Sequence, residues 1–217
     1  MTNGSAYFFG HNADTNLLPH DGQVYYHGSI MDAKQAAHYH DQLLATIPWQ
    51  QDEVVIFGKH IVTARKVAWV GDPGCDYRYS GTTKRVTPWT TALRALKVVV
   101  EGLSATRFNS CLLNLYHNGG EGMGWHSDDE PTLGIDPIIA SLSLGAARKF
   151  CFRHKKTKQT VAVMLEPGSL LIMRGATQAH WHHSLPKSSL IHHPRINLTF
   201  RTIIEKMEKT KRLGAGS

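Results

Sequence analysis

The residues of this chain that could hold a metal ion are a histidine and an aspartate two positions apart, together with histidines further along. In an extended segment His126 and Asp128 point to the same side, so both could bind one ion. His183 is the best candidate for a third ligand, and His180 and His182 compete with it. Two histidines and one carboxylate leave coordination positions open, which suits non-haem Fe(II). A lone His-x-Asp pair can also be a surface hydrogen bond, and that alternative stays open.

A strictly alternating segment near the end of the chain could hold an anion. The polar residues that would share one face of this strand are Arg195, Asn197, Thr199 and Arg201. Arginine pairs with carboxylates through two parallel hydrogen bonds and keeps its charge, so this face suits a small dicarboxylate in a polar barrel interior. Periodicity alone favours the alternative, a half-exposed strand with its polar face in water.

A second expected strand leads toward His126 and places Asn114 and Tyr116 on one face, either in the same pocket or toward solvent. Residues 117–124 follow it and contain four glycines. This segment is predicted to be either a mobile loop that covers a site or a long hairpin turn.

Two helices and many short strands are expected to position these residues. The first helix opens within residues 29–32 and ends at Pro48. The second has Thr87 as its N-cap and Pro88 in its first turn, and it stops at Gly102. Strands are predicted at residues 53–62, 65–70, 107–117, 138–144, 149–154, 160–165, 169–173, 179–184 and 195–204. This pattern predicts an α+β, mainly β domain whose body is a sandwich or barrel.

The composition is that of a globular chain with a basic surface. The 217 residues are 41% hydrophobic and 19% charged, which argues against a disordered or fibrous chain. No apolar stretch approaches the roughly 18 residues of a membrane span, and residues 1–18 lack the pattern of a secretory signal. Lys and Arg number 24 against 17 Asp and Glu, and this net charge of +7 favours polyanions such as nucleic acid. Three scattered cysteines disfavour a disulfide framework and indicate a reducing compartment.

Together these residues resemble the AlkB family of Fe(II)/2-oxoglutarate-dependent dioxygenases, and in particular its nucleic-acid repair branch. The matching pieces, in chain order between about residue 50 and residue 204, are Asn114-Leu115-Tyr116, His126-Ser127-Asp128-Asp129-Glu130, Ala140-Ser141-Leu142-Ser143-Leu144-Gly145, Trp181-His182-His183-Ser184-Leu185 and Arg195-Ile196-Asn197-Leu198-Thr199-Phe200-Arg201. The resemblance implies a double-stranded β-helix (jelly-roll) core with flanking N-terminal helices.

The resemblance also implies a role for each site residue. It makes His126, Asp128 and His183 the iron ligands. It places Asp129 and Glu130 against the damaged base, where the alternative is a solvated acidic loop. It assigns to 2-oxoglutarate, with the two arginines at its opposite carboxylate ends, Asn114, Tyr116, Arg195, Asn197, Thr199 and Arg201.

The segment before the core, about residues 53–85, resembles the nucleotide-recognition lid of that branch. Tyr79 would stack on the extruded base and Phe57 would probe the duplex, although each could be a core aromatic. Four basic residues could hold phosphates or form a solvated surface: Lys59, Arg65, Lys84 and Arg85. Together with Asp129 and Glu130, the residues expected to contact the substrate are Phe57, Gly58, Lys59, Arg65, Tyr77, Tyr79 and Ser80.

The implied activity is oxidative demethylation of bases of the 1-methyladenine and 3-methylcytosine type in DNA, with RNA also open. Fe(II) is the implied cofactor, 2-oxoglutarate and O2 are co-substrates, and formaldehyde, succinate and CO2 are the products. Two other functions stay open: a 2-oxoglutarate oxygenase acting on modified tRNA or protein, and a non-catalytic jelly-roll module that binds nucleic acid.

The domain organisation is expected to be simple. Residues 1–20 are predicted to be irregular, residues 21–204 to form one domain with its jelly-roll core at about 107–204, and residues 205–217 to be a basic tail. We expect a monomer without a membrane partner, located in the cytoplasm, at the nucleoid in a bacterium or in the nucleus of a eukaryote.

Overall fold

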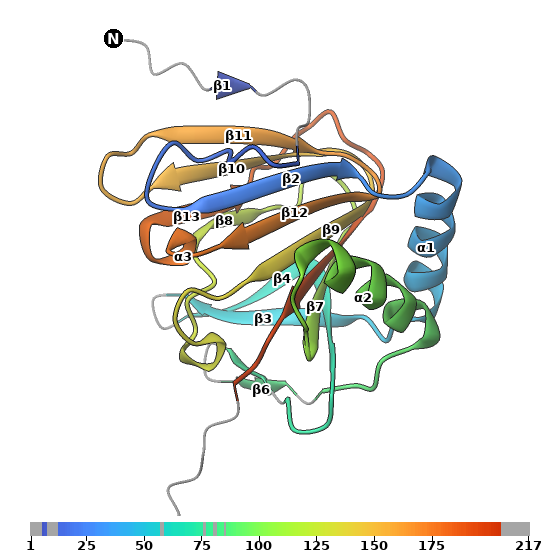
Figure 1. Ribbon diagram of the computed structural model, residues 1–217. Coiled ribbons are helices and arrows are strands. Elements are labelled where there is room, and N and C mark those ends of the chain that lie inside the picture. The colour runs from blue at the N-terminus through green and yellow to red at the C-terminus, as the bar shows by residue number, and fades with distance from the viewer. Residues whose placement is uncertain are drawn as a thin grey trace, which may run out of the picture.

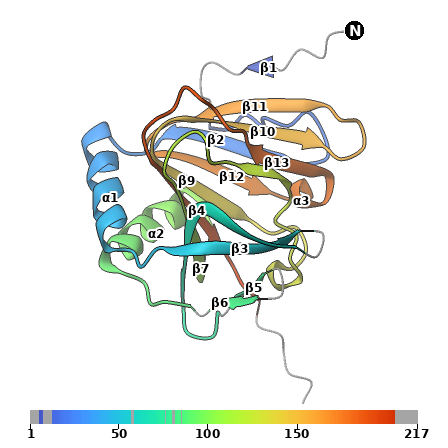
Figure 2. The same cartoon turned by 180° about the vertical axis from the view of Figure 1, so that it is seen from behind.

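The computed structural model describes residues 6–7, 13–56, 59–75, 77–79, 82–84 and 86–204. Its body consists of two β-sheets that face each other, with two helices on the outer side of the larger sheet (Figures 1 and 2). Side chains from both sheets meet in one buried cluster, including Tyr26, Phe152 and Trp181. The predicted α+β, mainly β jelly-roll is therefore confirmed.

The larger sheet has seven strands. In spatial order they are β2 (Gln23–Ser29), β12 (Ser169–Arg174), β9 (Ile139–Gly145), β14 (Arg195–Arg201), β7 (Ser110–Tyr116), β4 (Lys59–Gly71) and β3 (Gln50–Ile56). The smaller sheet contains β1 (Ala6–Tyr7), β11 (Thr160–Leu165), β10 (Arg148–His154), β13 (Trp181–Leu185) and β8 (Met123–His126). The strands β5 (Tyr77–Tyr79) and β6 (Thr82–Lys84) form a separate pair. Two short helical turns, η1 (Pro131–Leu133) and α3 (Thr177–His180), lie in the connections.

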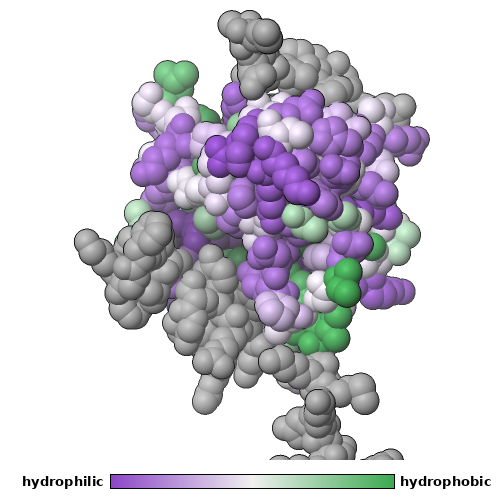
Figure 3. Space-filling view, turned by 90° about the vertical axis from the view of Figure 1, so that its left-hand side faces the viewer, coloured by the Kyte–Doolittle hydropathy of each residue, from purple (hydrophilic) through white to green (hydrophobic). Residues whose placement is uncertain are grey.

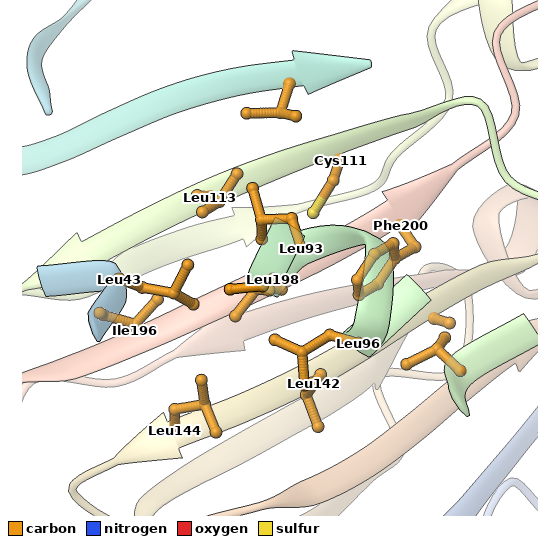
Figure 4. Close-up of a cluster of buried hydrophobic side chains, with 14 of the residues drawn as sticks. Leu43, Leu93, Leu96, Cys111, Leu113, Leu142, Leu144, Ile196, Leu198 and Phe200 are labelled. Carbon is orange, nitrogen blue, oxygen red and sulfur yellow. The ribbon is translucent and has the colours of Figure 1, made fainter. Parts of the chain in front are cut away.

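Strand β14 lies in the middle of the larger sheet, between β9 and β7, and every one of its residues is buried. Its apolar residues Ile196, Leu198 and Phe200 pack under the helices, together with Leu93 and Leu96 (Figure 4). Because strand side chains alternate, the polar residues of β14 face the space between the sheets. The alternative of a strand with its polar face in water is therefore wrong.

The two helices begin and end at residues that satisfy their terminal backbone groups. Helix α1 (Ala33–Thr46) begins after Asp32, whose Oδ1 accepts a hydrogen bond from the Gln35 amide at 2.7 Å. Helix α2 (Thr91–Ser104) begins after Thr90, whose Oγ1 accepts from the Leu93 amide at 3.2 Å. None of the helices among the residues that the structure describes is long and apolar enough to cross a membrane.

The predicted bounds of α2 are wrong at both ends. The Thr87 amide donates to the Trp69 carbonyl at 3.0 Å, and the Thr87 carbonyl accepts from Gly71 at 3.0 Å. This pairing holds the segment in an extended form alongside β4, so the helix begins only after Thr90. Gly102 lies inside the helix, which ends at Ala105 in the left-handed conformation with φ of 49°.

Several predicted strands also differ from the structure. The predicted strand at 53–62 spans the end of β3 and the start of β4, which pair antiparallel, and the predicted strand at 65–70 is the second half of β4. Strands β2 and β8 were not predicted, because each contains a glycine that weakens the strand pattern and β8 has only four residues. The predicted strand at 179–184 begins as the helical turn α3 and becomes extended only at Trp181.

Candidate metal centre and co-substrate pocket

Strands β8 and β13 bring the three predicted metal ligands together. These strands pair antiparallel, with His126 directly opposite His183, and Asp128 follows β8 by two residues. Asp128 Oδ1 lies 3.8 Å from His126 Nε2 and 3.9 Å from His183 Nε2. The ligand atoms of all three residues lie within 4.8 Å of one another.

Hydrogen bonds around the cluster leave the ligand atoms available. His126 Nδ1 donates to the Gly124 carbonyl at 2.9 Å, which leaves the Nε2 lone pair free for a metal ion. Asp128 Oδ2 accepts from Arg201 Nη2 at 3.0 Å, while Oδ1 faces the histidines. The Gln178 side chain holds the Asp128 backbone by accepting its amide at 2.9 Å. Two imidazoles and one carboxylate oriented in this way fit the facial ligand set of non-haem Fe(II).

The protonation states also suit metal binding. Burial opposes ionisation of Asp128, but Arg201, His183 and His126 together hold the pKa of this carboxyl below its usual value. Burial, with a smaller effect from His126, lowers the pKa of His183 to about 3. At neutral pH the site therefore presents a carboxylate and a neutral imidazole, the forms that bind metal ions.

A polar cavity extends from the three ligands along β14 and β7. All six residues predicted to bind 2-oxoglutarate line it, and Phe150, Met173 and Leu185 supply apolar walls. Arg195 is 2% exposed and donates only to neutral oxygens, Ser143 Oγ at 3.0 Å and Asn197 Oδ1 at 2.7 Å. Burial, with a smaller effect from nearby Arg148, lowers its pKa to about 10. A buried guanidinium without a carboxylate partner among the described residues is a candidate anion-binding group.

A second cavity adjoins the ligands on the side of β3 and β4. Its lining includes Asp52, Arg65, Met123 and Glu130. Arg65 is 6% exposed and forms a buried ion pair with Asp52, and its Nη1 lies 3.1 Å from Met123 Sδ. Arg65 is thus part of the cavity wall and not an exposed phosphate contact.

The predicted lid residues are only partly described. Phe57, Gly58, Ser80 and Arg85 lie outside the described residues, and the side chains of Lys59, Tyr77, Tyr79 and Lys84 are not described either. Among the predicted base contacts, Glu130 lines the second cavity, whereas the Asp129 side chain is 67% exposed and lies 3.9 Å from Lys155 Nζ.

The competing histidines lie elsewhere. His180 belongs to α3, and His182 points to the opposite face of β13 from His183. Sequence reasoning missed Asp52 and Gln178. Neither belongs to a recognisable motif, and only the fold brings them next to Arg65 and Asp128.

The glycine-rich segment after β7 forms hydrogen bonds with the loop that follows β13 (Trp181–Leu185). The Gly119 amide donates to the Ile191 carbonyl at 2.7 Å, and the Gly119 carbonyl accepts from Ser188 at 2.8 Å. A Cβ at position 119 would lie 2.1 Å from the Ser188 carbonyl oxygen, so the close approach of the two loops requires glycine.

A second cluster of metal-ligating residue types, His20, Asp21 and His154, lies away from this cavity. His154 Nε2 is 3.3 Å from Asp21 Oδ2. However, His154 Nδ1 accepts a hydrogen bond from the Thr157 amide at 3.0 Å, so the proton of the neutral imidazole is on Nε2. With that nitrogen protonated, His154 offers no lone pair to a metal ion.

Comparison with known proteins agrees with this geometry. A family model described as the 2OG-Fe(II) oxygenase superfamily matches residues 22–201. Human alpha-ketoglutarate-dependent dioxygenase alkB homolog 3 is 42% identical over 184 residues, which cover 80% of this chain and 64% of the human protein. Mouse DNA oxidative demethylase ALKBH2 is 41% identical over 160 residues, which cover 70% of this chain and 67% of the mouse protein.

A solved structure also resembles the fold. An oxidoreductase of the 2OG-Fe(II) oxygenase family from Burkholderia pseudomallei superposes with a TM-score of 0.57 at 14% identity, covering 91% of this chain and 94% of that one. The chain spans about two thirds of the length of the curated relatives it matches. It belongs to the 2OG-Fe(II) oxygenase superfamily and, within it, to the AlkB family.

Proposed function

We propose that this protein is a dioxygenase that uses Fe(II), 2-oxoglutarate and O2 to demethylate N-alkylated bases of the 1-methyladenine and 3-methylcytosine type in DNA or RNA. The observation that carries the proposal is the meeting of His126, Asp128 and His183 at one end of a cavity whose other end holds the buried Arg195. The relatives named as an alkB homolog dioxygenase and a DNA oxidative demethylase support the same activity.

When bound, the metal and the keto acid supply the oxidation of the N-methyl group, which leaves as formaldehyde. The residues of the chain position the reactants. Arg195 and Arg201 neutralise the carboxylates of 2-oxoglutarate, while Asn114, Asn197 and Thr199 offer hydrogen bonds along the cavity. The keto acid is thereby oriented toward the metal ligands.

The second cavity is the proposed position of the extruded base. It opens beside His126 and includes Glu130 and Asp52. Bases methylated at these nitrogens are cationic, and the Glu130 carboxylate favours a cation over the neutral base, whereas Asp52 is paired with Arg65. Extruding such a base costs less than extruding a paired one, because the lesion blocks pairing.

A basic face on the outside of the smaller sheet supports a polyanionic substrate. Burial lowers the pKa of His182, and the charges of Lys155, Arg153 and Lys158 lower it further, which indicates a positive local potential. The Arg153 guanidinium lies 4.2 Å from the ring centroid of exposed Trp125. The side of the molecule that includes the end of this sheet is mainly hydrophilic (Figure 3). Cationic and aromatic side chains of this kind suit a nucleic-acid strand.

The direct test is formaldehyde release from oligonucleotides carrying 1-methyladenine or 3-methylcytosine, with Fe(II), 2-oxoglutarate and ascorbate supplied. We expect turnover by the wild-type protein and by His180→Ala, and none by His183→Ala. Folding of each variant is checked by circular dichroism. Equal activity of His183→Ala and the wild-type protein would refute the assignment of His183 as a metal ligand.

The same assay separates the alternatives. Turnover on methylated tRNA or on protein, but not on DNA, would favour another 2-oxoglutarate oxygenase. Nucleic-acid binding without any succinate production would favour a non-catalytic module. We further propose that the protein acts as a monomer in the compartment that holds its nucleic-acid substrate, which gel filtration and localisation of the tagged protein would test.

A further inference from the structure

Arg148 is a buried charged residue that the proposed chemistry does not use. It begins β10 and is 1% exposed, which makes it one of the largest fully buried side chains among the described residues. Burying a guanidinium is costly unless its donors are satisfied. Among the described residues, Arg148 has no ion pair with an acidic side chain, and it donates instead to main-chain carbonyls.

These carbonyls belong to two different loops. Nη2 donates to the Glu121 carbonyl at 2.8 Å and to the Pro186 carbonyl at 2.9 Å, and Nη1 lies 3.4 Å from the Asn118 carbonyl. The first loop follows β7, which carries two of the proposed co-substrate residues, Asn114 and Tyr116. The second loop follows β13, which carries His183. One side chain thus ties together the ends of the strands that build the two halves of the site.

Arg148 also contacts the wall of the co-substrate cavity from behind. Its guanidinium carbon lies 5.9 Å from the ring centroid of Tyr116, and that of Arg195 lies 5.6 Å from the same centroid. Tyr116 and Arg195 line the cavity, whereas Arg148 does not. Tyr116 therefore lies next to both guanidiniums, and one of them, that of Arg148, does not line the cavity.

We propose that Arg148 is a positioning residue that fixes Tyr116 and the loop after β7, and that it thereby sets the affinity of the cavity for the carboxylate of 2-oxoglutarate far from the metal. This inference rests on the proposed function. The guanidinium spans carbonyls of two loops through a rigid fork of donors, which a lysine ammonium cannot reproduce. We therefore expect that a positive charge at position 148 does not suffice to fix the two loops, and that the fork geometry of the guanidinium donors is required.

The test measures binding and not only turnover. The dissociation constant of 2-oxoglutarate is measured by calorimetry without oxygen, on protein loaded with Mn(II), for the wild type, Arg148→Lys and Arg148→Gln. We expect both variants to bind 2-oxoglutarate at least about tenfold more weakly, because misplacement of positioning groups has effects of this size or larger. The matched control is Arg174→Lys, since Arg174 also donates to a main-chain carbonyl, that of Ser104, away from the cavity.

Binding of oxalate distinguishes a specific effect at the far end of the cavity from disruption of the whole site. Oxalate can chelate the metal but does not reach the far end of the cavity. We expect oxalate to bind Arg148→Lys as tightly as it binds the wild type. In turnover, the KM for 2-oxoglutarate rises and kcat at saturation is retained. If Arg148→Gln does not fold, Arg148→Lys decides the matter.

Three results would overturn the inference: unchanged 2-oxoglutarate binding by Arg148→Lys, equal weakening of oxalate, or equal weakening by Arg174→Lys. Failure of the wild-type protein to bind 2-oxoglutarate would instead overturn the proposed function, and the inference with it.

Discussion

Replacing Arg195 with methionine is expected to stabilise the ligand-free protein while abolishing its response to 2-oxoglutarate. Arg195 is almost fully buried, and its acceptors, Ser143 and Asn197, are both neutral. Burial and the charge of Arg148 lower its pKa to about 10, well below the ordinary value for arginine. Methionine has similar length and no charge, so it removes the cost of burial and leaves the cavity wall filled.

The size of the effect follows from the lowered pKa. At 1.36 kcal/mol per pKa unit, the charged form of Arg195 disfavours folding by about 3 kcal/mol. The folded protein carries this charge at every pH below about 10, so the cost is fully present at neutral pH, and it declines as the pH rises above about 10. Two lost hydrogen bonds of about 1 kcal/mol each offset most of the gain. A net stabilisation of about 1 kcal/mol corresponds to a rise in Tm of about 2–4 °C.

Thermal unfolding at pH 8 measures both effects. The wild-type Tm should rise when 2-oxoglutarate is added to the Mn(II)-loaded protein, whereas that of Arg195→Met should not. Arg94→Met, which removes an exposed arginine from α2, serves as the control and should resemble the wild type. A ligand-free Arg195→Met with a Tm several degrees below that of the wild type, or one that keeps the full response to 2-oxoglutarate, would refute the reasoning.

Three further substitutions test separate parts of the structure. Asp128→Asn should lower Mn(II) affinity at least about 100-fold in calorimetry, because the amide lacks the ligand charge; unchanged affinity would exclude Asp128 as a ligand. Glu101→Gln should reduce the free energy of unfolding by about 1–3 kcal/mol at pH 7, since Glu101 accepts from the Phe108 amide and Arg107. Burial opposes ionisation of Glu101, but these donors hold its pKa below its usual value, so the difference from the wild type should shrink in urea unfolding as the pH falls through that lowered pKa. Leu198→Ala should cost about 2–5 kcal/mol in urea unfolding without changing 2-oxoglutarate binding.

The sequence was most informative about which residues share one face of a strand. The alternation of residues 195–201 placed Arg195 and Arg201 on one face, and the structure buries that face between the sheets. His126 and Asp128 meet His183 because β8 and β13 pair directly. The ligand and co-substrate roles of these residues stay predictions until binding is measured.

The sequence was least informative where a distant segment decides the local structure. Thr87 and Pro88 form a sound helix start by local rules, but pairing of Thr87 with Trp69 keeps the segment extended. Likewise, nothing near Arg148 in the chain indicates that its guanidinium binds carbonyls of two loops. Such contacts depend on tertiary structure, which no local pattern encodes.

The balance of buried charge explains why this cavity should require both a metal ion and a dianion. Around the cavity, Asp128 is the carboxylate among the metal ligands, and it already pairs with Arg201. Arg195 then remains as an excess positive charge in a site screened from water. A divalent cation bound by Asp128 increases that excess, and a dicarboxylate that reaches from the metal to Arg195 reduces it again. We therefore expect a bound metal ion to increase the affinity of the cavity for the dicarboxylate. Arg148, which adds a further positive charge next to Tyr116, should also increase the affinity of the cavity for the dicarboxylate.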